Sequence, residues 1–534
     1  MPESWHITGR SSWGLTVFEM SQAGAYDRTK KSIRNSVVAV SLQVVSLLIG
    51  FWSRRIFLNH LGTEVLGLNT TANSLLQFLN LAEMGIGSAI AVTLYKPIFD
   101  DDKNSIKEIV ALQGWMYKII ALIVMGGSAI MMCFFPMIFS KTPLPLWYAY
   151  ASFGVLLYSS LLGYFFNYKQ ILLDAHQLNY KIQLSIKLIS IFKLIAQAFS
   201  IKYLDNGYIW WLVLEAVFAT ISAIVLSRTV NKTFPYIAEK VESPAELRHK
   251  YPEVVTKVKQ LFIHKIAGFA SNQLTPVIIY AFASLTLVAK YGNYLILTSN
   301  LNYVLAACFL GITSSIGNML SEHNDGLTLK VFRELFSIRQ FVNFVSCICL
   351  WFLVDPFIRL WIGDEYILDR TTLLLIIIIF YIYNSRTVVD TFLNAYGLFQ
   401  DIWSPVTETV LGVISSILLG RTYGLNGILT GMIVSQFLIA KVWKPIFLFS
   451  QGIQKPLSIY LIINAKHFIN GILSFTTVYL FTRFTKFECN SFGIFTVYAV
   501  TVFAISVVMM FGLEYLTEQG MRTFIKRIFA IFKS

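Results

Sequence analysis

This chain of 534 residues has too little polar surface to be a water-soluble globule. Hydrophobic residues make up 56% of it, aromatic residues 15% and charged residues only 13%, and its mean hydropathy is +0.63. A soluble enzyme of this length is therefore excluded. The formal net charge is +14. Because the basic residues stand at the ends of apolar stretches, where anionic lipid headgroups attract them, we do not expect nucleic acid as a partner.

Apolar stretches long enough to cross a bilayer recur along the whole chain. We expect about fourteen transmembrane helices, in a range of roughly 12 to 14. The first seven candidates are 36–58, 65–94, 110–139, 146–166, 182–201, 208–226 and 266–288. The other seven are 294–320, 341–358, 373–394, 406–419, 427–447, 468–481 and 492–511. The sequence thus predicts an all-α, polytopic integral membrane protein.

Basic residues are distributed unevenly between the two ends of these stretches. Roughly thirty of the 43 Lys and Arg residues fall in alternate gaps, and the intervening gaps hold about ten. The basic gaps are the N-terminal segment, the segment 228–265, the segment 441–466 and the C-terminal tail. Because Lys and Arg favour the cytoplasmic side, we predict that both termini are cytoplasmic, as in an inner-membrane protein.

These signals divide the chain into six segments. A cytoplasmic leader at 1–35 precedes a first lobe of six helices at 36–230, and a basic cytoplasmic linker at 231–265 precedes a second such lobe at 266–450. Two further helices at 451–515 and a basic cytoplasmic tail at 516–534 complete the chain. A faint repeat at an offset of about 225 residues supports two related lobes, an arrangement in which transporters rock two bundles around a central site.

Sequence motifs for ATP hydrolysis and for metal chemistry are missing. No Gly is followed by Lys, so the phosphate-binding loop Gly-x-x-x-x-Gly-Lys is not present, and His-Glu-x-x-His does not occur. The five Cys residues are odd in number, and most stand in apolar stretches, where Cys is usually a small core residue. We therefore expect neither a cofactor nor a bound metal.

Polar residues inside the second stretch share one face of a helix. At 100° per residue, about a third of the circumference holds Asn69, Asn73, Gln77, Asn80 and Glu83. Two interpretations stay open, namely hydrogen bonding between helices and the lining of a water-filled substrate path. Because Glu83 has no basic neighbour at helical spacing, it is a candidate proton carrier for ion coupling.

A second polar face lies on the tenth stretch, where Arg386, Asp390 and Asn394 follow one another at a spacing of four. Arg386 and Asp390 can form an ion pair across one turn. This pair either makes membrane insertion tolerable or acts as a switch, in which a substrate phosphate competes with Asp390 for Arg386. Asp390 is the second candidate for ion coupling.

Further cations stand within predicted helices. Lys187 and Lys193 share a face of the fifth stretch, and Arg54 and Arg55 lie near the end of the first. Each can also be explained by a long side chain that reaches the headgroups. Together with Arg386 they predict a cationic cavity that suits an anionic ligand, since Arg offers two parallel donors to diphosphate oxygens.

The seventh stretch adds two amides to this predicted lining. Asn272 and Gln273 stand shortly before Pro276, which removes a backbone hydrogen bond and allows a bend. We expect these amides to join the polar face of the second stretch in the same lining.

Four short runs carry a resemblance to a known family. Residues 55–68 (RIFLNHLGTEVLGL) and 83–87 (EMGIG) resemble the first two helices of the polysaccharide transport family. Residues 356–366 (PFIRLWIGDEY) and 424–428 (GLNGI) are similar to recurrent turns in its second half. The similarity covers nearly the whole chain from Asn35 onward. The family includes the Wzx-type flippases of O-antigen and capsule repeat units, within the multidrug/oligosaccharidyl-lipid/polysaccharide (MOP) superfamily.

The resemblance implies a V-shaped bundle of two six-helix lobes, with two extra C-terminal helices and no catalytic residues. It also implies a cargo, a polyprenyl (undecaprenyl)-diphosphate-linked oligosaccharide. Members of the family move this cargo across the bacterial inner membrane by alternating access, for assembly of O-antigen, capsule or exopolysaccharide. The partners implied are membrane lipids, a polysaccharide polymerase and a chain-length regulator.

Other functions stay open on the sequence. One is a lipid II or multidrug exporter of the same superfamily, although an exporter of organic cations should prefer an acidic and aromatic lining. Another is a membrane polysaccharide polymerase or glycosyltransferase. Such an enzyme usually displays catalytic acids on the outer side, whereas the acidic run at residues 100–102 is predicted to be cytoplasmic.

Overall fold

The computed structural model describes residues 12–83, 86–140, 142–176, 178–238, 247–248, 250–252, 275–309, 325–396, 398, 401, 403–485 and 487–533. Helices and short connections account for all of these residues, and no strand occurs among them. The predicted all-α class is thus confirmed.

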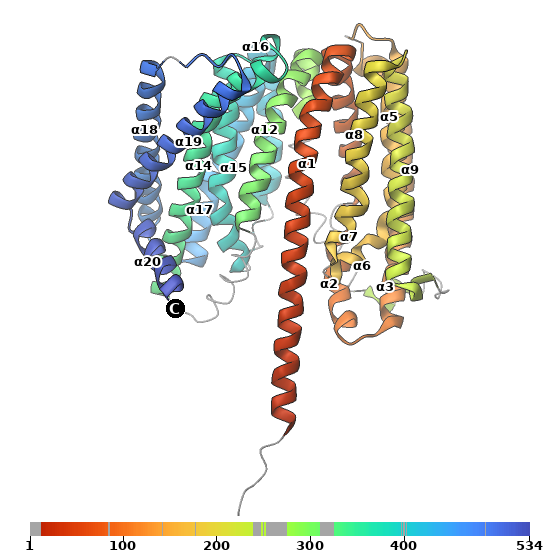
Figure 1. The fold of residues 1–534 in the computed structure, drawn as a ribbon, viewed down its shortest axis with the longest axis horizontal. Coiled ribbons are helices and arrows are strands. Elements are labelled where there is room, and N and C mark those ends of the chain that lie inside the picture. The colour runs from red at the N-terminus through yellow and green to blue at the C-terminus, as the bar shows by residue number, and fades with distance from the viewer. Residues whose placement is uncertain are drawn as a thin grey trace, which may run out of the picture. The chain divides into compact units, whose positions relative to one another are not determined.

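Helices follow one another along the chain with short turns between them (Figure 1). The first half contains α1 (Ser12–Leu79), a 3₁₀ turn (Asn80–Glu83), α2 (Ile86–Phe99), α3 (Lys103–Cys133), α4 (Phe135–Ile138), α5 (Leu146–Phe165), a 3₁₀ turn (Asn167–Lys169), α6 (Gln170–Ala175), α7 (Asn179–Gln183), a π-helical segment (Leu184–Leu188), α8 (Ile189–Tyr203), α9 (Gly207–Thr233) and a 3₁₀ turn (Pro235–Ala238). The second half contains α12 (Leu285–Phe309), α14 (Asp325–Trp361), a 3₁₀ turn (Asp364–Tyr366), α15 (Arg370–Ala395), α16 (Trp403–Gln436), a π-helical segment (Phe437–Trp443), α17 (Lys444–Phe447), a second π-helical segment (Leu448–Gly452), α18 (Leu457–Thr485), α19 (Phe492–Thr517) and α20 (Gln519–Lys533).

Nine stretches within the described residues are long and apolar enough to cross a membrane. They are Ser41–Leu79, Lys103–Cys133, Leu146–Phe165, Asn179–Tyr203, Gly207–Thr233, Gly326–Trp361, Arg370–Ala395, Trp403–Gly452 and Phe492–Thr517. The eleventh and twelfth predicted stretches lie together in Trp403–Gly452. The seventh and eighth extend partly outside the described residues.

Large apolar side chains lie on the outside of these helices. Leu48 is 65% exposed, Leu122 is 64% exposed and Val508 is 67% exposed, each well within a long helix. Such a surface would drive aggregation in water, but it is satisfied by lipid, and the helices satisfy their own backbone groups. The chain is therefore a multi-pass membrane protein.

Contacts within the chain divide it into two compact units. The first unit comprises Met1–His60, Ala82–Met132 and Ala151–Phe262, and the second comprises Leu61–Leu81, Cys133–Tyr150 and Ile263–Ser534. The main division falls inside the predicted linker at 231–265. Two segments that the sequence placed in the first lobe, Leu61–Leu81 and Cys133–Tyr150, group instead with the second unit.

Two glycines turn the chain where the sequence predicted separate helices. Gly62 lies within α1 at φ 80° and Gly424 lies within α16 at φ 55°, and both interrupt the helical backbone. Gly adopts these positive φ values readily because it has no Cβ. Each glycine therefore marks the turn between two consecutive spans.

The two halves of α16 pack closely beyond this turn. The Ser415 hydroxyl donates to the Gly431 carbonyl at 2.9 Å, and the Ser416 hydroxyl donates to the Ile428 carbonyl at 2.9 Å. A Cβ at Gly431 would stand 2.3 Å from the backbone nitrogen of Ser416. Small residues thus bring the backbones of neighbouring membrane helices together.

We expect Gly431→Leu to lower the stability of the second unit by about 2–3 kcal/mol, because overpacking against backbone cannot be relieved by a rotamer change. Thermal unfolding of the detergent-purified protein, followed by tryptophan fluorescence, measures this change. Gly126→Leu is the matched control, since a Cβ at Gly126 meets nothing within 4 Å. Equal melting temperatures for the two variants would contradict the close packing.

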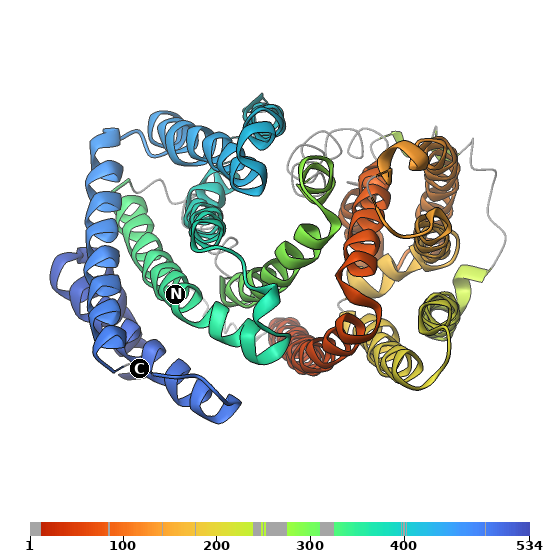
Figure 2. The ribbon, with the colours of Figure 1, turned by 90° about the horizontal axis from the view of Figure 1, so that it is seen from above.

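An aromatic cluster forms the core of the second unit. Phe332, Phe336, Phe392, Phe449 and Tyr460 are buried and bring together α14, α15, the segment Leu448–Gly452 and α18. Phe332 contacts Phe392 edge-to-face with ring centroids 5.3 Å apart, a geometry that adds to the gain from burial. In the view from above, α14 is flanked by α15 on one side and by α18 and α19 on the other (Figure 2).

The C-terminal helices are attached to α14 by polar contacts. His467 Nδ1 on α18 lies 2.7 Å from Glu514 Oε1 on α19, and both side chains are fully buried. His467 Nε2 lies 3.5 Å from the hydroxyl of Ser337 on α14. The predicted tail at 516–534 is helical from Gln519 to Lys533 and packs as α20 against α14.

Candidate functional site

Lys187 is a cation of the first unit that sits beside an amide. It lies in the π-helical segment Leu184–Leu188, and its Nζ donates to Gln43 Oε1 on α1 at 2.5 Å. In the part of the chain that the structure describes, this ammonium is bonded to an amide oxygen and not paired with a carboxylate. π-helical turns are rare and frequently occur at functional sites.

Helix α1 runs beside α8 in the same direction. Gln43 contacts Lys187, Ser53 Oγ lies 3.4 Å from the Leu194 carbonyl, and Trp52 contacts Phe199 edge-to-face at 6.0 Å. This register puts the predicted cations of the first unit along one pair of helices. Arg54 is half-buried, whereas Arg55 is exposed.

Arg55 lines a cavity of about 430 Å³ at one end of this helix pair. Lys202 and His60 line the same cavity, together with Trp52 and Tyr203. Lys187 and Lys193 are not among its lining residues. The predicted cations of the first unit therefore do not share one pocket.

Lys193 carries its own counter-ion. Its Nζ lies 2.7 Å from Glu215 Oε1 on α9, and Gln197 Nε2 donates to the other carboxylate oxygen at 3.0 Å. α8 and α9 lie side by side along their length (Figure 1). A phosphate that binds Lys193 must compete with Glu215.

Glu83 lies next to a group of tyrosines in the first unit. The Tyr117 hydroxyl on α3 donates to Glu83 Oε1 at 3.0 Å. The Tyr117 ring contacts Tyr164 at 5.9 Å and stacks on Tyr168 at 6.2 Å. The proton-carrier role of Glu83 stays a prediction.

Arg386 is the centre of a charge network in the second unit. Its guanidinium lies 3.0 Å from Asp390 Oδ2 and 2.8 Å from Glu408 Oε1 on α16. Asp390 Oδ1 is in turn 2.5 Å from Lys444 Nζ on α17. The predicted ion pair across one turn is present. Two cations and two carboxylates alternate along this network, so its formal charge is zero.

The polar face of the second stretch does not continue as one helix to Glu83. α1 ends at Leu79, and a 3₁₀ turn follows, so the phase of 100° per residue changes there. Asn69 is buried, Asn73 is exposed, and Gln77 and Asn80 are half-buried. These four residues belong to the second unit, whereas Glu83 belongs to the first.

Three predicted amides remain, namely Asn394, Asn272 and Gln273. Asn394 is exposed near the C-terminal end of α15. Asn272 and Gln273 lie outside the described residues.

Lys441 is a cation that the sequence analysis did not single out. It lies in the π-helical segment Phe437–Trp443, and its Nζ is 4.6 Å from the centroid of the Tyr381 ring. The ammonium is buried and makes no hydrogen bond to any residue that the structure describes. Each unit therefore has a Lys in a π-helical segment without a carboxylate partner among the described residues.

A buried polar group lies one turn from Tyr381. Arg339, which is 3% exposed, donates to Asn384 Oδ1 at 2.7 Å and to the Leu305 carbonyl at 3.2 Å. Asn384 Nδ2 donates to Asn302 Oδ1 at 2.6 Å. α12, α14 and α15 are thus linked by amide and guanidinium groups.

Sequence reasoning missed the partners Gln43, Tyr117, Glu215, Glu408 and Lys444. Glu215 and Glu408 are isolated acids inside apolar stretches, which is itself a sign of a buried partner. Gln43 and Tyr117 have no such signal, since amides and tyrosines are common in membrane helices. Lys444 stands in the segment 441–466, which the sequence analysis treated only as a basic gap. Among the described residues, no group of three or more His, Cys, Asp or Glu side chains could hold a metal ion.

Comparison with known proteins gives likeness of structure only. No protein-family model matches the sequence, and no curated protein sequence matches it. The structure is similar to that of the lipid II flippase MurJ in an inward closed conformation, with a TM-score of 0.63 over 90% of this chain and 98% of that chain, at 14% identity. It is also similar to an inward-facing multidrug resistance MATE family transporter of the MOP superfamily, with a TM-score of 0.59 over 78% of this chain and 98% of that chain, at 13% identity. The chain is therefore a multi-pass membrane protein with the fold shared by these MOP-type transporters.

Proposed function

We propose that this protein is a flippase that moves a polyprenyl-diphosphate-linked oligosaccharide across the bacterial inner membrane by alternating access. The proposal rests on the fold shared with a lipid II flippase and on one observation, that Lys187 and Lys441 have no carboxylate partner among the described residues. An ammonium group without a counter-ion is costly inside a membrane protein. A diphosphate ligand would supply the missing negative charge.

The cargo explains why cations and amides occur on the same helices. A diphosphate and a hydrophilic glycan cannot cross hydrocarbon unaided, whereas a polyprenyl tail can stay in lipid. In this proposal Arg54, Arg55, Lys187 and Lys193 of the first unit contact the diphosphate at successive positions along its path, since they do not share one pocket.

The amide groups are assigned to the glycan. They hydrogen-bond sugar hydroxyls in this proposal, and they are Asn69, Asn73, Gln77, Asn80, Asn272, Gln273 and Asn394. Arg386 binds phosphate when the phosphate displaces Asp390 or Glu408 from it. Release of the phosphate re-forms the neutral network, which favours the return of the empty carrier.

Glu83 and Asp390 are the proposed ion-coupling residues. If Glu83 carries a proton, Glu83→Gln removes the dependence of transport on the proton gradient and keeps the acceptor for Tyr117. Tyr117→Phe, which leaves the carboxyl group in place, should retain the gradient dependence. Transport by proteoliposomes at a series of imposed gradients measures both. A Glu83→Gln protein that responds to the gradient as the wild type does would exclude the role.

In the proposed setting both termini lie in the cytoplasm, as the charge distribution predicts. The protein works beside a polysaccharide polymerase and a chain-length regulator, as the resemblance to the polysaccharide transport family implies. The polymerase would receive the repeat unit at the outer face. The protein itself carries out no bond-making or bond-breaking step in this proposal.

A multidrug exporter is the second candidate, and the similar fold of the MATE family transporter favours it. The two candidates differ in the charge of the cargo that each of these two lysines would meet. An organic cation would be repelled by Lys187 and Lys441, whereas a diphosphate is attracted by both.

Depletion of the protein in cells tests the proposal. We expect single, complete polyprenyl-diphosphate-linked repeat units to accumulate on the cytoplasmic side, with loss of surface polysaccharide. Accumulation of lipid II would identify that molecule as the cargo. Repeat units that reach the outer face but stay unpolymerised would point to a polymerase, and no change in lipid-linked sugars would contradict the flippase.

A further inference from the structure

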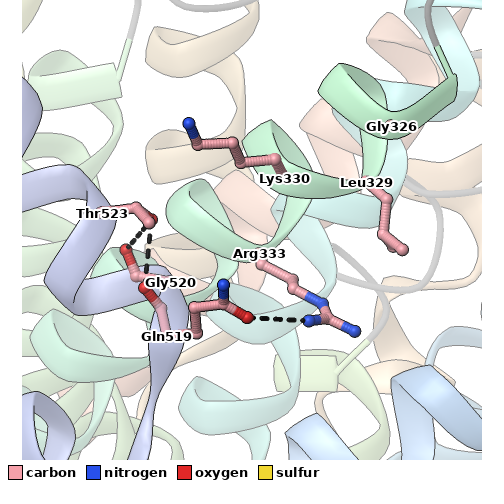
Figure 3. A pocket seen from close by; sticks show the side chains of 7 residues that line it. All are labelled: Gly326, Leu329, Lys330, Arg333, Gln519, Gly520 and Thr523. Carbon is pink, nitrogen blue, oxygen red and sulfur yellow. Dashed lines mark hydrogen bonds between the residues drawn. The ribbon is translucent and has the colours of Figure 1, made fainter.

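A second basic site lies in the second unit, between the start of α14 and the start of α20. A cavity of about 220 Å³ opens there. Figure 3 shows Lys330 and Arg333 of α14 on one side of it and Gln519, Gly520 and Thr523 of α20 on the other. This cavity shares no residue with the proposed transport site.

The cations of this cavity are available to a ligand. Lys330 is exposed and makes no hydrogen bond or ion pair within the described residues. Arg333 Nη1 donates one long bond of 3.4 Å to Gln519 Oε1, and its Nε is buried without a hydrogen-bond partner in the described part of the chain. The neighbouring Glu334 pairs elsewhere, with Arg527 at 3.0 Å. Two cationic groups therefore have donors left for an anion.

α20 supplies a close backbone and further donors. Gly520 lies so near α14 that a Cβ there would stand 2.3 Å from the Arg333 carbonyl oxygen. Gln519 accepts from Arg333 through its oxygen, which leaves its amide nitrogen as a donor. The first turn of a helix also favours an anion, because its backbone N–H groups point outward along the axis. These donors suit the oxygens of an anion such as phosphate.

The amphipathic character of α20 favours a lipid headgroup over free phosphate as the source of the anion. Among its described side chains, the apolar Met521, Phe524 and Ile525 lie on one face, and the cations Arg522, Lys526 and Arg527 lie on the other. A short helix of this kind lies in the plane of the headgroups. Lys330 and Arg333 precede the apolar stretch that begins at about Phe341 by only two to three turns.

We propose that the cavity between α14 and α20 binds the headgroup phosphate of an anionic phospholipid. Lys330 and Arg333 contact the phosphate oxygens, and the half-buried Phe524 and Ile525 of α20 lie against the acyl chains. Bound lipid would hold α20 on α14. Since only Glu518 separates α20 from α19, the lipid would also fix the C-terminal end of α19.

Native mass spectrometry of the full chain in neutral detergent tests this proposal, with phosphatidylglycerol as the probe and phosphatidylcholine for comparison. We expect the wild type to prefer phosphatidylglycerol. Lys330→Gln should weaken that binding about fivefold, and Lys330→Gln with Arg333→Gln by more than tenfold, since each cation near a headgroup contributes about 1 kcal/mol. Lys455→Gln removes an exposed cation outside the cavity and should leave the affinity unchanged.

Folding and the source of phosphate are controlled separately. Lys330→Gln removes no contact within the described residues, so its lipid-free melting temperature should equal that of the wild type. Equal phosphatidylglycerol affinities for wild type, Lys330→Gln and Lys455→Gln would overturn the proposal. Full displacement of the lipid by inorganic phosphate at equal concentration would also overturn it, because the site would then be one for free phosphate.

Discussion

Arg386→Gln is expected to destabilise the second unit by about 3–5 kcal/mol, because it leaves a buried carboxylate uncompensated. Asp390 keeps Lys444 at 2.5 Å, but Glu408 loses the guanidinium at 2.8 Å. Adding Glu408→Gln to this variant should recover most of the lost stability, since the remaining Asp390–Lys444 pair is neutral. Thermal unfolding in detergent measures both proteins.

In a coupled network the stability changes of Arg386→Gln and Glu408→Gln do not add, whereas those of independent surface pairs do. Arg421→Gln, which removes an exposed cation from the same helix as Glu408, should leave the melting temperature unchanged. If Glu408→Gln instead adds its own loss to that of Arg386→Gln, the two side chains do not form one network.

Lys441→Met is expected to raise the melting temperature and to lower transport about tenfold. The stability should rise because the variant replaces a buried ammonium that has no hydrogen-bond partner among the described residues with an apolar side chain of similar shape. Transport should fall because a charge-assisted hydrogen bond to phosphate, worth about 1.5–3 kcal/mol, is lost. A higher melting temperature together with slower transport is expected when a residue serves ligand binding at a cost in stability.

Lys187→Gln should lower transport to a similar extent, with little change in stability, because Gln can still hydrogen-bond Gln43. Lys232→Gln is the matched control, since Lys232 is an exposed cation of the first unit near the C-terminal end of α9. A Lys441→Met protein that transports normally would remove this residue from the cargo path.

Much of the architecture followed from hydrophobicity alone. The tenth predicted stretch, 373–394, lies within α15, Arg370–Ala395. An apolar run of about 20 residues bounded by polar turns is expected to form one transmembrane helix. The pair Arg386 and Asp390 was also predictable, since residues four apart on a helix are neighbours. Both features depend on one continuous segment of the sequence, so they could be predicted without knowing which helices are neighbours.

The partners on other helices were not predictable in the same way. Glu408 and Lys444 reach the pair from α16 and α17, and no local spacing shows which helices are neighbours. The predicted helix at 65–94 failed for a different reason, since a 3₁₀ turn at Asn80–Glu83 divides it. The tail at 516–534 carried a helical signal in its apolar residues, which recur every three or four positions, and this signal was read only as basic charge.

Reconstitution of the purified protein in proteoliposomes tests the flippase function most directly. A fluorescent polyprenyl-diphosphate-linked oligosaccharide is incorporated, and its arrival in the outer leaflet is followed by a reagent that reacts only with outward-facing sugar. We predict that the wild type moves the lipid and that the Lys187→Gln/Lys441→Met double variant does not. Lipid movement at the wild-type rate by the double variant, or none by the wild type, would contradict the account.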